Sequence, residues 1–138
     1  MRTVLAVGLF LTTASVFGQL GTSWPCADEL KRSQGVKQIV PVSAGVSVGL
    51  VRKKVLPDIS DLKHSKTKSD VAVRIAIGKD GMVLCAEAEE GDNDLWARSV
   101  DAAKQWQFKP YMLNGEPVII QTMIEFSFNK SKVSARFD

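Results

Sequence analysis

The chain has 138 residues, of which 45% are hydrophobic and 24% charged, so it has room for one domain of ordinary globular composition and is not of the disordered class. The formal net charge is +3, and it falls to +2 without residues 1–18, because that segment holds one arginine and no acid. These few positive charges are scattered along the chain, so the sequence predicts no nucleic-acid partner.

Residues 1–18 have the features of a cleaved signal peptide. Arg2 precedes an apolar run over residues 4–17, and the small residues around Gly18 favour cleavage before Gln19. The run is shorter than the roughly 20 apolar residues that a membrane span needs. We therefore expect an exported, periplasmic protein, and an uncleaved inner-membrane anchor stays open as the alternative.

Residues 19–45 are predicted to be an N-terminal extension. The polar stretch from Asp28 to Gln34 favours one or two helical turns that end at Gly35. Residues 39–42 and 46–51 are rich in β-branched side chains, so both are predicted to be extended. Pro41 argues against a central strand in the first of them. Residues 57–68 are predicted to form a loop, and His64 within it is expected to be solvated.

The two cysteines, Cys26 and Cys85, can form a disulfide in an exported protein. The alternative is that Cys85 is a small buried side chain and Cys26 a free thiol, since geometry decides disulfide formation. Two cysteines and a single histidine do not supply a closed four-ligand zinc site. No metal and no cofactor are therefore expected.

Residues 71–88 predict a β-hairpin. Apolar residues alternate over residues 71–77, which is the period of a half-buried strand. Asp80 and Gly81 suit the tight turn that follows. Residues 82–88 form the second predicted strand, with the side chains at positions 82, 84, 86 and 88 on one face.

A helix is predicted over about residues 94–105. Asp92 or Asn93 can cap its first turn, and an apolar stripe recurs at helical spacing from Leu95 to Trp106. The last strand covers residues 118–128, with its even-numbered side chains in the core. Residues 129–138 are expected to be a frayed tail.

These elements predict an α+β fold. Following the chain direction, an all-antiparallel sheet needs the last strand beside the first strand of the hairpin, in the order second–first–last. The helix covers one face of this sheet. The last strand then lies at an edge unless residues 46–56 or another chain cover it.

Five acids cluster where the hairpin leads into the helix: Glu87, Glu89, Glu90, Asp92 and Asp94. On an exposed turn such groups are expected to be solvated or to cap the helix, because acid–base catalysis needs a setting that shifts their pKa. The sequence has no nucleophile motif and no glycine-rich phosphate loop. We expect no enzymatic activity and no small-molecule substrate.

Three motifs resemble the C-terminal domain of the TonB family. They are Gly78-Lys79-Asp80-Gly81, the Trp-x-Phe-x-Pro pattern at residues 106–110, and the Asn-Gly-x-Pro-Val pattern at residues 114–118. The resemblance covers residues 46–128. Folding alone explains the motif residues, since Trp106 and Phe108 are apolar anchors, Pro110 is expected to stop the helix, and Asn114-Gly115 is a turn.

The resemblance implies a periplasmic module that docks on outer-membrane receptors. In that family a receptor's short TonB box adds a strand to the edge of the domain's sheet. Carried onto this chain, the docking edge is the last strand, at Gln121, Thr122, Met123, Ile124 and Glu125. The alternative is that the tail, residues 46–56 or a second copy caps this edge, as in a stand-alone exported structural or dimerising domain. The family's long Pro-rich spacer has no counterpart in residues 19–45.

Overall fold

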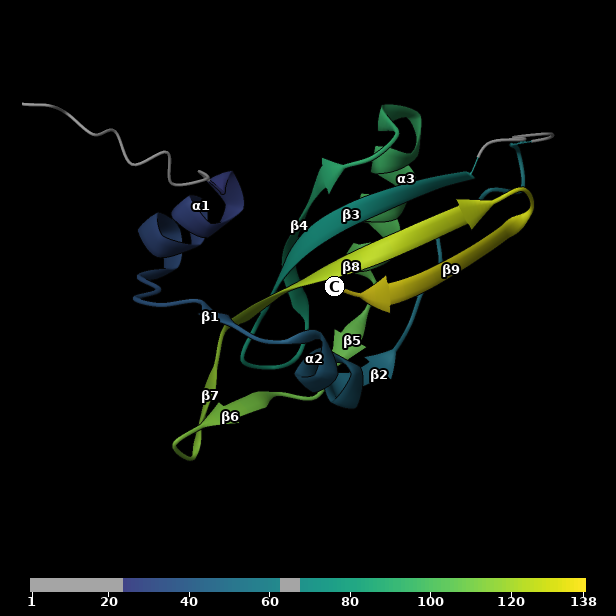
Figure 1. The fold of residues 1–138 in the computed structure, drawn as a ribbon. Helices are drawn as coiled ribbons and strands as arrows, with labels where there is room; N and C mark the ends of the chain where they lie inside the picture. The colour runs from purple at the N-terminus through teal and green to yellow at the C-terminus, as the bar shows by residue number, and fades with distance from the viewer. Residues whose placement is uncertain (1–23, 63–67) are drawn as a thin grey trace, which may run out of the picture.

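A sheet of five strands organises the fold (Figure 1). The computed structural model describes residues 24–62 and 68–138, and the count refers to these residues. The strands are β1 (Val40–Pro41), β3 (Lys68–Ile77), β4 (Val83–Glu90), β8 (Ile120–Asn129) and β9 (Lys132–Phe137). The order β8–β3–β4 confirms the predicted order of second, first and last strand, and β1 and β9 both pair with β8.

Helices and short strands surround this sheet. The helices are α1 (Pro25–Gln34), α2 (Ala44–Leu50) and α3 (Asn93–Lys104). Two further antiparallel pairs join β2 (Val51–Lys53) to β5 (Gln107–Phe108), and β6 (Tyr111–Leu113) to β7 (Glu116–Val118). The α+β class predicted from the sequence is confirmed. Figure 1 shows α3 behind the sheet and the β6–β7 hairpin at its lower end.

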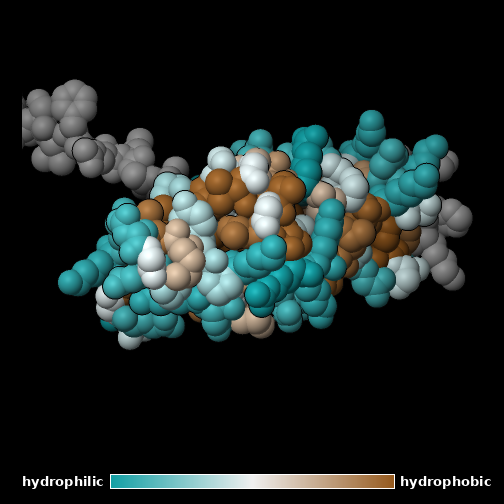
Figure 2. Space-filling model, turned by 90° about the horizontal axis from the view of Figure 1, so that it is seen from below, coloured by the Kyte–Doolittle hydropathy of each residue, from teal (hydrophilic) through white to brown (hydrophobic). Residues whose placement is uncertain are grey.

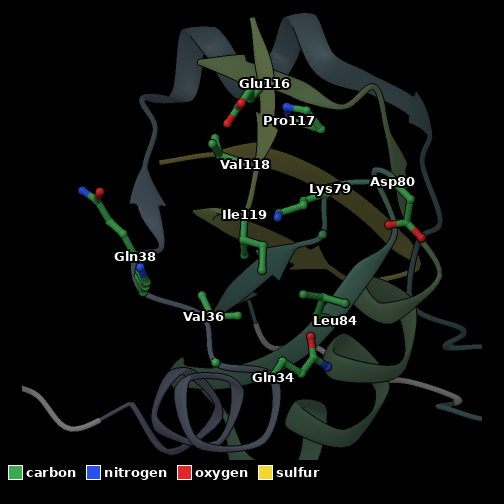
Figure 3. Close-up of a pocket in the computed structure, with 13 residues that line it drawn as sticks. Gln34, Val36, Gln38, Lys79, Asp80, Leu84, Glu116, Pro117, Val118 and Ile119 are labelled. Carbon is green, nitrogen blue, oxygen red and sulfur yellow. The ribbon is translucent and has the colours of Figure 1, made fainter. Parts of the chain in front are cut away.

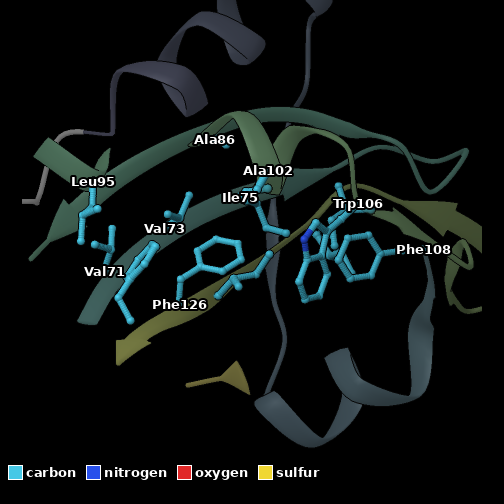
Figure 4. Close-up of a cluster of buried hydrophobic side chains, with 14 residues drawn as sticks. Val71, Val73, Ile75, Ala86, Leu95, Ala102, Trp106, Phe108 and Phe126 are labelled. Atoms are coloured by element: carbon cyan, nitrogen blue, oxygen red, sulfur yellow. The ribbon is translucent and has the colours of Figure 1, made fainter. Parts of the chain in front are cut away.

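The main core lies between the sheet and α3 (Figure 4). Alternate residues of β3 and β8 point to this side because side chains along a strand alternate between faces. The helix contributes small side chains, including Ser99 and Ala103, which are fully buried and let α3 lie close to the strands. Trp106 and Phe108 close the end of the core, with ring centroids 6.1 Å apart. The alternation predicted for residues 120–128 is confirmed.

A second, smaller core covers part of the opposite face of the sheet. There Trp24 and Leu30 pack with Ala76 and Ile119. Helix α1 begins with a proline, whose missing N–H costs nothing in a first turn, and it ends at Gly35, which has a φ of 62°. The helix is longer than the one or two turns predicted. The extension is thus packed against the sheet.

The hairpin and the main helix are where the sequence places them. β3 pairs with both β4 and β8. The Asp92 side chain accepts a hydrogen bond from the N–H of Asp94, so it is the N-cap of α3. The helix ends at Lys104, six residues before Pro110, so the prediction that this proline stops the helix is wrong. Pro110 lies between the short strands β5 and β6 instead.

Residues 44–50 form a helix, so the prediction of an extended segment at residues 46–51 is wrong. The Ser43 side chain caps α2 by accepting a hydrogen bond from the N–H of Val46. The hydroxyl of Ser47 is fully buried and lies 2.6 Å from the hydroxyl of Thr122 on β8. This tertiary contact and the cap outweigh the strand preference of the valines. Residues 40–41 are extended as predicted, at the edge where Pro41 is tolerated.

The C-terminal residues 132–137 form strand β9, so the prediction of a frayed tail is wrong. A two-residue turn with Lys130 at a φ of 57° reverses the chain after β8. Phe137 then packs edge-on against Trp106, with ring centroids 5.6 Å apart. This aromatic contact and six registered residue pairs with β8 hold the segment in place.

Strand β4 departs from the predicted face. Met82 and Leu84 are exposed to 45% and 37%, although the sequence pattern places them with Ala86 and Ala88. The register of β3 and β4 shifts between Ala76 and Ile77, which inserts an extra residue near the turn. Such a bulge reverses the alternation of side chains at the start of the strand, so Leu84 does not share the face of Ala86.

Candidate functional site

The predicted docking strand β8 is flanked on both sides. β3 pairs with it along all ten residues, from Ile120 to Asn129. On its other side, β1 pairs with Ile120 and Gln121, and β9 pairs with residues 124–129. The remaining carbonyl between them, on Met123, accepts a hydrogen bond from the N–H of Asp138. The prediction that residues 121–125 form an open edge is therefore wrong.

The side chains of the predicted docking residues point to two different faces. Thr122 and Ile124 are buried in the main core. Gln121, Met123 and Glu125 lie on the opposite face and are half-buried, and Glu125 forms an ion pair with Arg136 of β9. The sequence left open whether the tail caps this edge, because the hairpin of β8 and β9 is held by the contacts of Phe137, which local patterning does not reveal.

The outer edges of the described sheet belong to β4 and to β9. β4 pairs only with β3 among the described strands, but two register shifts interrupt this pairing. Its last residues carry the acids predicted to be solvated, and Glu89 forms a 2.7 Å ion pair with Arg74 of β3. Bulges and charges are the devices by which proteins discourage a further strand.

The outer edge of β9 is regular. Lys54 donates a hydrogen bond of 2.9 Å from its Nζ to the carbonyl of Ala135, so this carbonyl points away from β8. Backbone groups on an antiparallel strand alternate in direction, so the N–H and C=O groups of Val133 and Phe137 also face outward. No described strand pairs with this side of β9.

Trp106 connects this edge to the main core. It is 1% exposed, and its indole N–H donates a 2.7 Å hydrogen bond to the carbonyl of Val55. Its ring contacts Phe126 and Phe137, and the ammonium of Lys54 lies 5.8 Å from the ring centroid. The two rings of the Trp-x-Phe motif thus pack against Phe137 on the core side of β9, and the Trp106 ring also attracts the ammonium of Lys54, which reaches the outer edge.

The two turn motifs have separate structural roles. Gly81 has a φ of 84°, and a Cβ atom there would lie 1.9 Å from the carbonyl oxygen of Phe108. Asp80 accepts a hydrogen bond from the N–H of Met82 within the same turn. Asn114 and Gly115 have φ values of 52° and 81° and form the two-residue turn between β6 and β7. The first motif therefore joins the hairpin to the Trp-x-Phe segment.

The cysteines are joined in a disulfide between α1 and β4, with Cα atoms 6.2 Å apart. Beside it, the N–H of Cys26 donates to the carboxylate of Glu87. The alternative of a free Cys26 thiol does not hold in this structure. Among the described residues, no group of three or more histidines, cysteines and acids is placed to hold a metal ion.

Three acids of the strand–helix turn have structural partners: Glu87 accepts from the N–H of Cys26, Glu89 pairs with Arg74, and Asp92 caps α3. Two acids in the loop before β3 have lowered pKa values. Hydrogen bonds from Arg98 lower the pKa of Asp61, and the N–H of Ser60 lowers the pKa of Asp58. Arg98 lies on α3 and binds both oxygens of Asp61, at 2.7 and 2.6 Å. These groups fasten residues 58–61 to the helix.

Gly91 and Lys54 also have structural roles that the sequence alone did not predict. A Cβ atom on Gly91, which has a φ of 108°, would lie 2.1 Å from the carbonyl of Asp70. Lys54 reaches the β9 edge, as described above. The glycine before the helix is a signal that a turn analysis can find, whereas the long reach of Lys54 has no local signature.

Exposed apolar side chains gather at the lower end of the fold. Val46 and Val48 of α2 and Met112 and Leu113 of β6 are all exposed, with Val48 at 64%. These elements lie at the bottom of Figure 1, and Figure 2 shows hydrophobic residues across the centre of the molecule from that side. No helix in the described part of the chain has the length and apolar character to cross a membrane.

The family described as Gram-negative bacterial TonB protein C-terminal matches residues 60–129, which is more than half of the chain. The match contains all three motifs. It begins in the loop of residues 58–61, which Arg98 of α3 binds, and ends with β8. The curated proteins and the solved structures compared with the chain gave no match. The chain belongs to the TonB C-terminal family.

Proposed function

We propose that the chain is a non-enzymatic binding module of the periplasm, which takes part in TonB-dependent transport by adding an extended segment of an outer-membrane receptor to its sheet. The family is associated with energy transduction for transport. The observation that carries the proposal is the open outer side of β9 within the described sheet. Residues 1–18 serve as the export signal in this proposal, and they lie outside the described residues.

The contacts of β9 favour it over β4 as the docking edge. Six residue pairs hold β9 to β8 without a register shift, so its outward N–H and C=O groups are evenly arranged. Among the described residues, the hydrogen bond that a partner strand would have to break on this side of β9 is the one from the Lys54 side chain to the carbonyl of Ala135. Because lysine is long and mobile, this displacement costs little compared with the main-chain bonds gained.

A proline at position 135 tests this edge. Ala135→Pro removes the outward N–H and leaves the bonds between β9 and β8, since those use the neighbouring residues. We expect peptides with TonB box sequences to bind the original protein and to bind this variant about tenfold more weakly. Ala135→Ser keeps the N–H and should bind like the original.

Calorimetric titration gives the affinities, and NMR spectra of the backbone amides locate the site. Circular dichroism checks that the proline variant is folded, and a peptide N-methylated at the pairing positions repeats the test without altering the protein. Equal affinity for both variants, or amide shifts confined to β4, would contradict docking on β9.

A second candidate function is a stand-alone dimerising domain, which the exposed apolar side chains of α2 and β6 favour. In that case Val48→Glu should convert a dimer into a monomer, because a buried carboxylate is costly at an interface. Sedimentation equilibrium measures this. A monomer at all concentrations in the original protein counts against the dimerising role.

A further inference from the structure

A groove lies where the N-terminal extension meets the sheet (Figure 3). Its volume is about 690 Å³. One wall is residues 34–38, which are the last residue of α1 and the segment after it. The opposite wall is β7 with Ile119, and the β3–β4 turn of residues 78–80 closes the space between them. The extension lies outside the matched family region, so this groove is a feature that the extension adds to the domain.

The first wall has main-chain groups available for bonding. Residues 36–38 are neither helix nor strand, and they form no main-chain hydrogen bond to another segment that the structure describes. Pairing begins only at Val40, whose N–H donates to the carbonyl of Ile119 at 2.9 Å. An extended polypeptide can therefore bond to this wall without displacing a strand.

The groove combines apolar surface with positive charge. Val36, Leu84 and Ile119 supply its apolar lining. Figure 3 shows the side chain of Lys79 pointing into the space between the walls, and Lys37 belongs to the first wall. Within the described residues, neither lysine has an ion-pair partner.

The two acids of the groove lie away from the Lys79 ammonium. The carboxylate of Asp80 accepts a hydrogen bond from the N–H of Met82, and in Figure 3 it lies on the other side of the turn from the end of the Lys79 side chain. Glu116 lies at the opposite end from Gln34 in Figure 3. The centre of the groove, around Lys79, therefore favours a negatively charged group.

We propose that this groove binds an extended segment of a partner protein in which an acidic residue stands among apolar ones. The partner's main chain bonds to residues 36–38, its apolar side chains cover Leu84 and Ile119, and its carboxylate pairs with Lys79. This site is separate from the edge of β9, so one partner segment can occupy each.

The disulfide holds the first wall in place. Cys26 lies in the first turn of α1, the helix that leads into the wall, and is bonded to Cys85 in β4. Without this bond α1 is held mainly by the small core around Trp24, while β1 still pairs with β8 at the far end of the wall. Opening the disulfide is therefore expected to weaken binding in the groove and to leave binding at β9 unchanged.

A capped nine-residue peptide with alternating glutamate and valine is the probe, and the same peptide with lysine in place of glutamate is the matched control. NMR spectra of the oxidised protein are recorded during titration. We expect the acidic peptide to shift the amides of residues 36–38 and of Lys79, with Lys79→Glu weakening its binding about fivefold or more. Lys109→Glu, an equal charge change outside the groove, should leave the affinity unchanged.

The control peptide should cause no shift in these amides. Three results would overturn the proposal: equal binding of both peptides, unchanged affinity in Lys79→Glu, or amide shifts confined to β9. If Lys79→Glu fails to fold, Lys79→Gln and the salt dependence of binding by the original protein decide the question, since a charge pair weakens as salt rises.

Discussion

Gly81 stands where the hairpin turn meets the backbone of the Trp-x-Phe segment. A Cβ atom there would lie 1.9 Å from the carbonyl oxygen of Phe108, and the φ of 84° adds strain for any L side chain. We expect Gly81→Ala to lower the free energy of unfolding by about 3 kcal/mol or more. Gly115→Ala is the control, because its φ is 81° but nothing lies within 4 Å.

The control should cost only the conformational strain, about 1–2 kcal/mol. Guanidinium unfolding followed by tryptophan fluorescence measures both variants. If the two glycine variants lose equal stability, the close approach between the turn and Phe108 adds nothing to the free-energy cost of the Gly81 substitution.

The hydroxyl pair of Ser47 and Thr122 accounts for the position of α2. The two oxygens lie 2.6 Å apart in a buried site, and Ser47 also donates to the carbonyl of Ser43. Ser47→Ala leaves the Thr122 hydroxyl without this partner, so we expect a loss of about 1–3 kcal/mol. Thr122→Val added to it should cost less than the sum of the single changes, because both partners are then gone.

Ser99→Ala is the matched control for that cycle. Ser99 is equally buried, but its hydroxyl donates only to the helical carbonyl of Leu95. Its removal leaves no side-chain partner behind and should cost less than Ser47→Ala. Strict additivity of Ser47→Ala and Thr122→Val in urea unfolding would show that the hydroxyls do not interact.

The sequence predicted the elements whose pattern is local and missed those that depend on partners. β3, β8 and α3 follow from their periods of two and 3.6 residues. α2 was missed because its valines favour strand, whereas the contact with Thr122 is distant in sequence. β9 was missed because its outward residues are polar and its hold on the core comes mainly from Phe137.

The same limit applies to the candidate site. Which residues form strand β8 was predictable, but whether its edge is open depends on how the last residues fold back. The motif residues Gly81, Trp106 and Phe108 were found because their types are distinctive. Lys54 was not found, since its contact with Ala135 spans 81 residues.

The link between α3 and the loop of residues 58–61 should depend on acid pH. The pKa of Asp61 lies below its ordinary 3.8 because Arg98 donates to it, and the N–H of Ser60 lowers that of Asp58. Carboxyls with lowered pKa values stabilise the fold above about pH 3.8 and lose that contribution as the pH falls through their lower, folded values.

Arg98→Gln isolates this contribution. At neutral pH the variant should unfold at a lower urea concentration than the original protein, and the difference should shrink as the pH falls from about 4 towards 2. Ser60 still donates to Asp58 in the variant, so part of the acid dependence remains. A difference that stays constant over this range would exclude titration of Asp61 as its cause.

At the scale of the whole molecule, the extension and the domain form one folded unit. α1 packs on the face of the sheet opposite α3, so the strands are covered on both sides near Ala76. β1 then continues the sheet beside β8 and carries the chain into α2. Both candidate binding surfaces depend on segments outside the matched region, namely β9 and residues 34–38.

The disulfide is the covalent link between the extension and the sheet, and its removal measures how strongly the two depend on each other. Cys26 and Cys85 are 59 residues apart, and closing a loop of this length restricts the unfolded chain by about 4 kcal/mol at 25 °C. We expect Cys26→Ala combined with Cys85→Ala to lose about 2–4 kcal/mol of unfolding free energy. Reductant should destabilise the original protein by a similar amount and leave the double variant unaffected.

Hydrogen exchange in the double variant shows what the disulfide does for α1. Since Trp24 and Leu30 still pack on the sheet, α1 should remain helical, but its amide protons should exchange faster than in the original protein and faster than those of α3. If the disulfide merely links two independently stable parts, the exchange rates of α1 will be the same in the double variant and in the original protein.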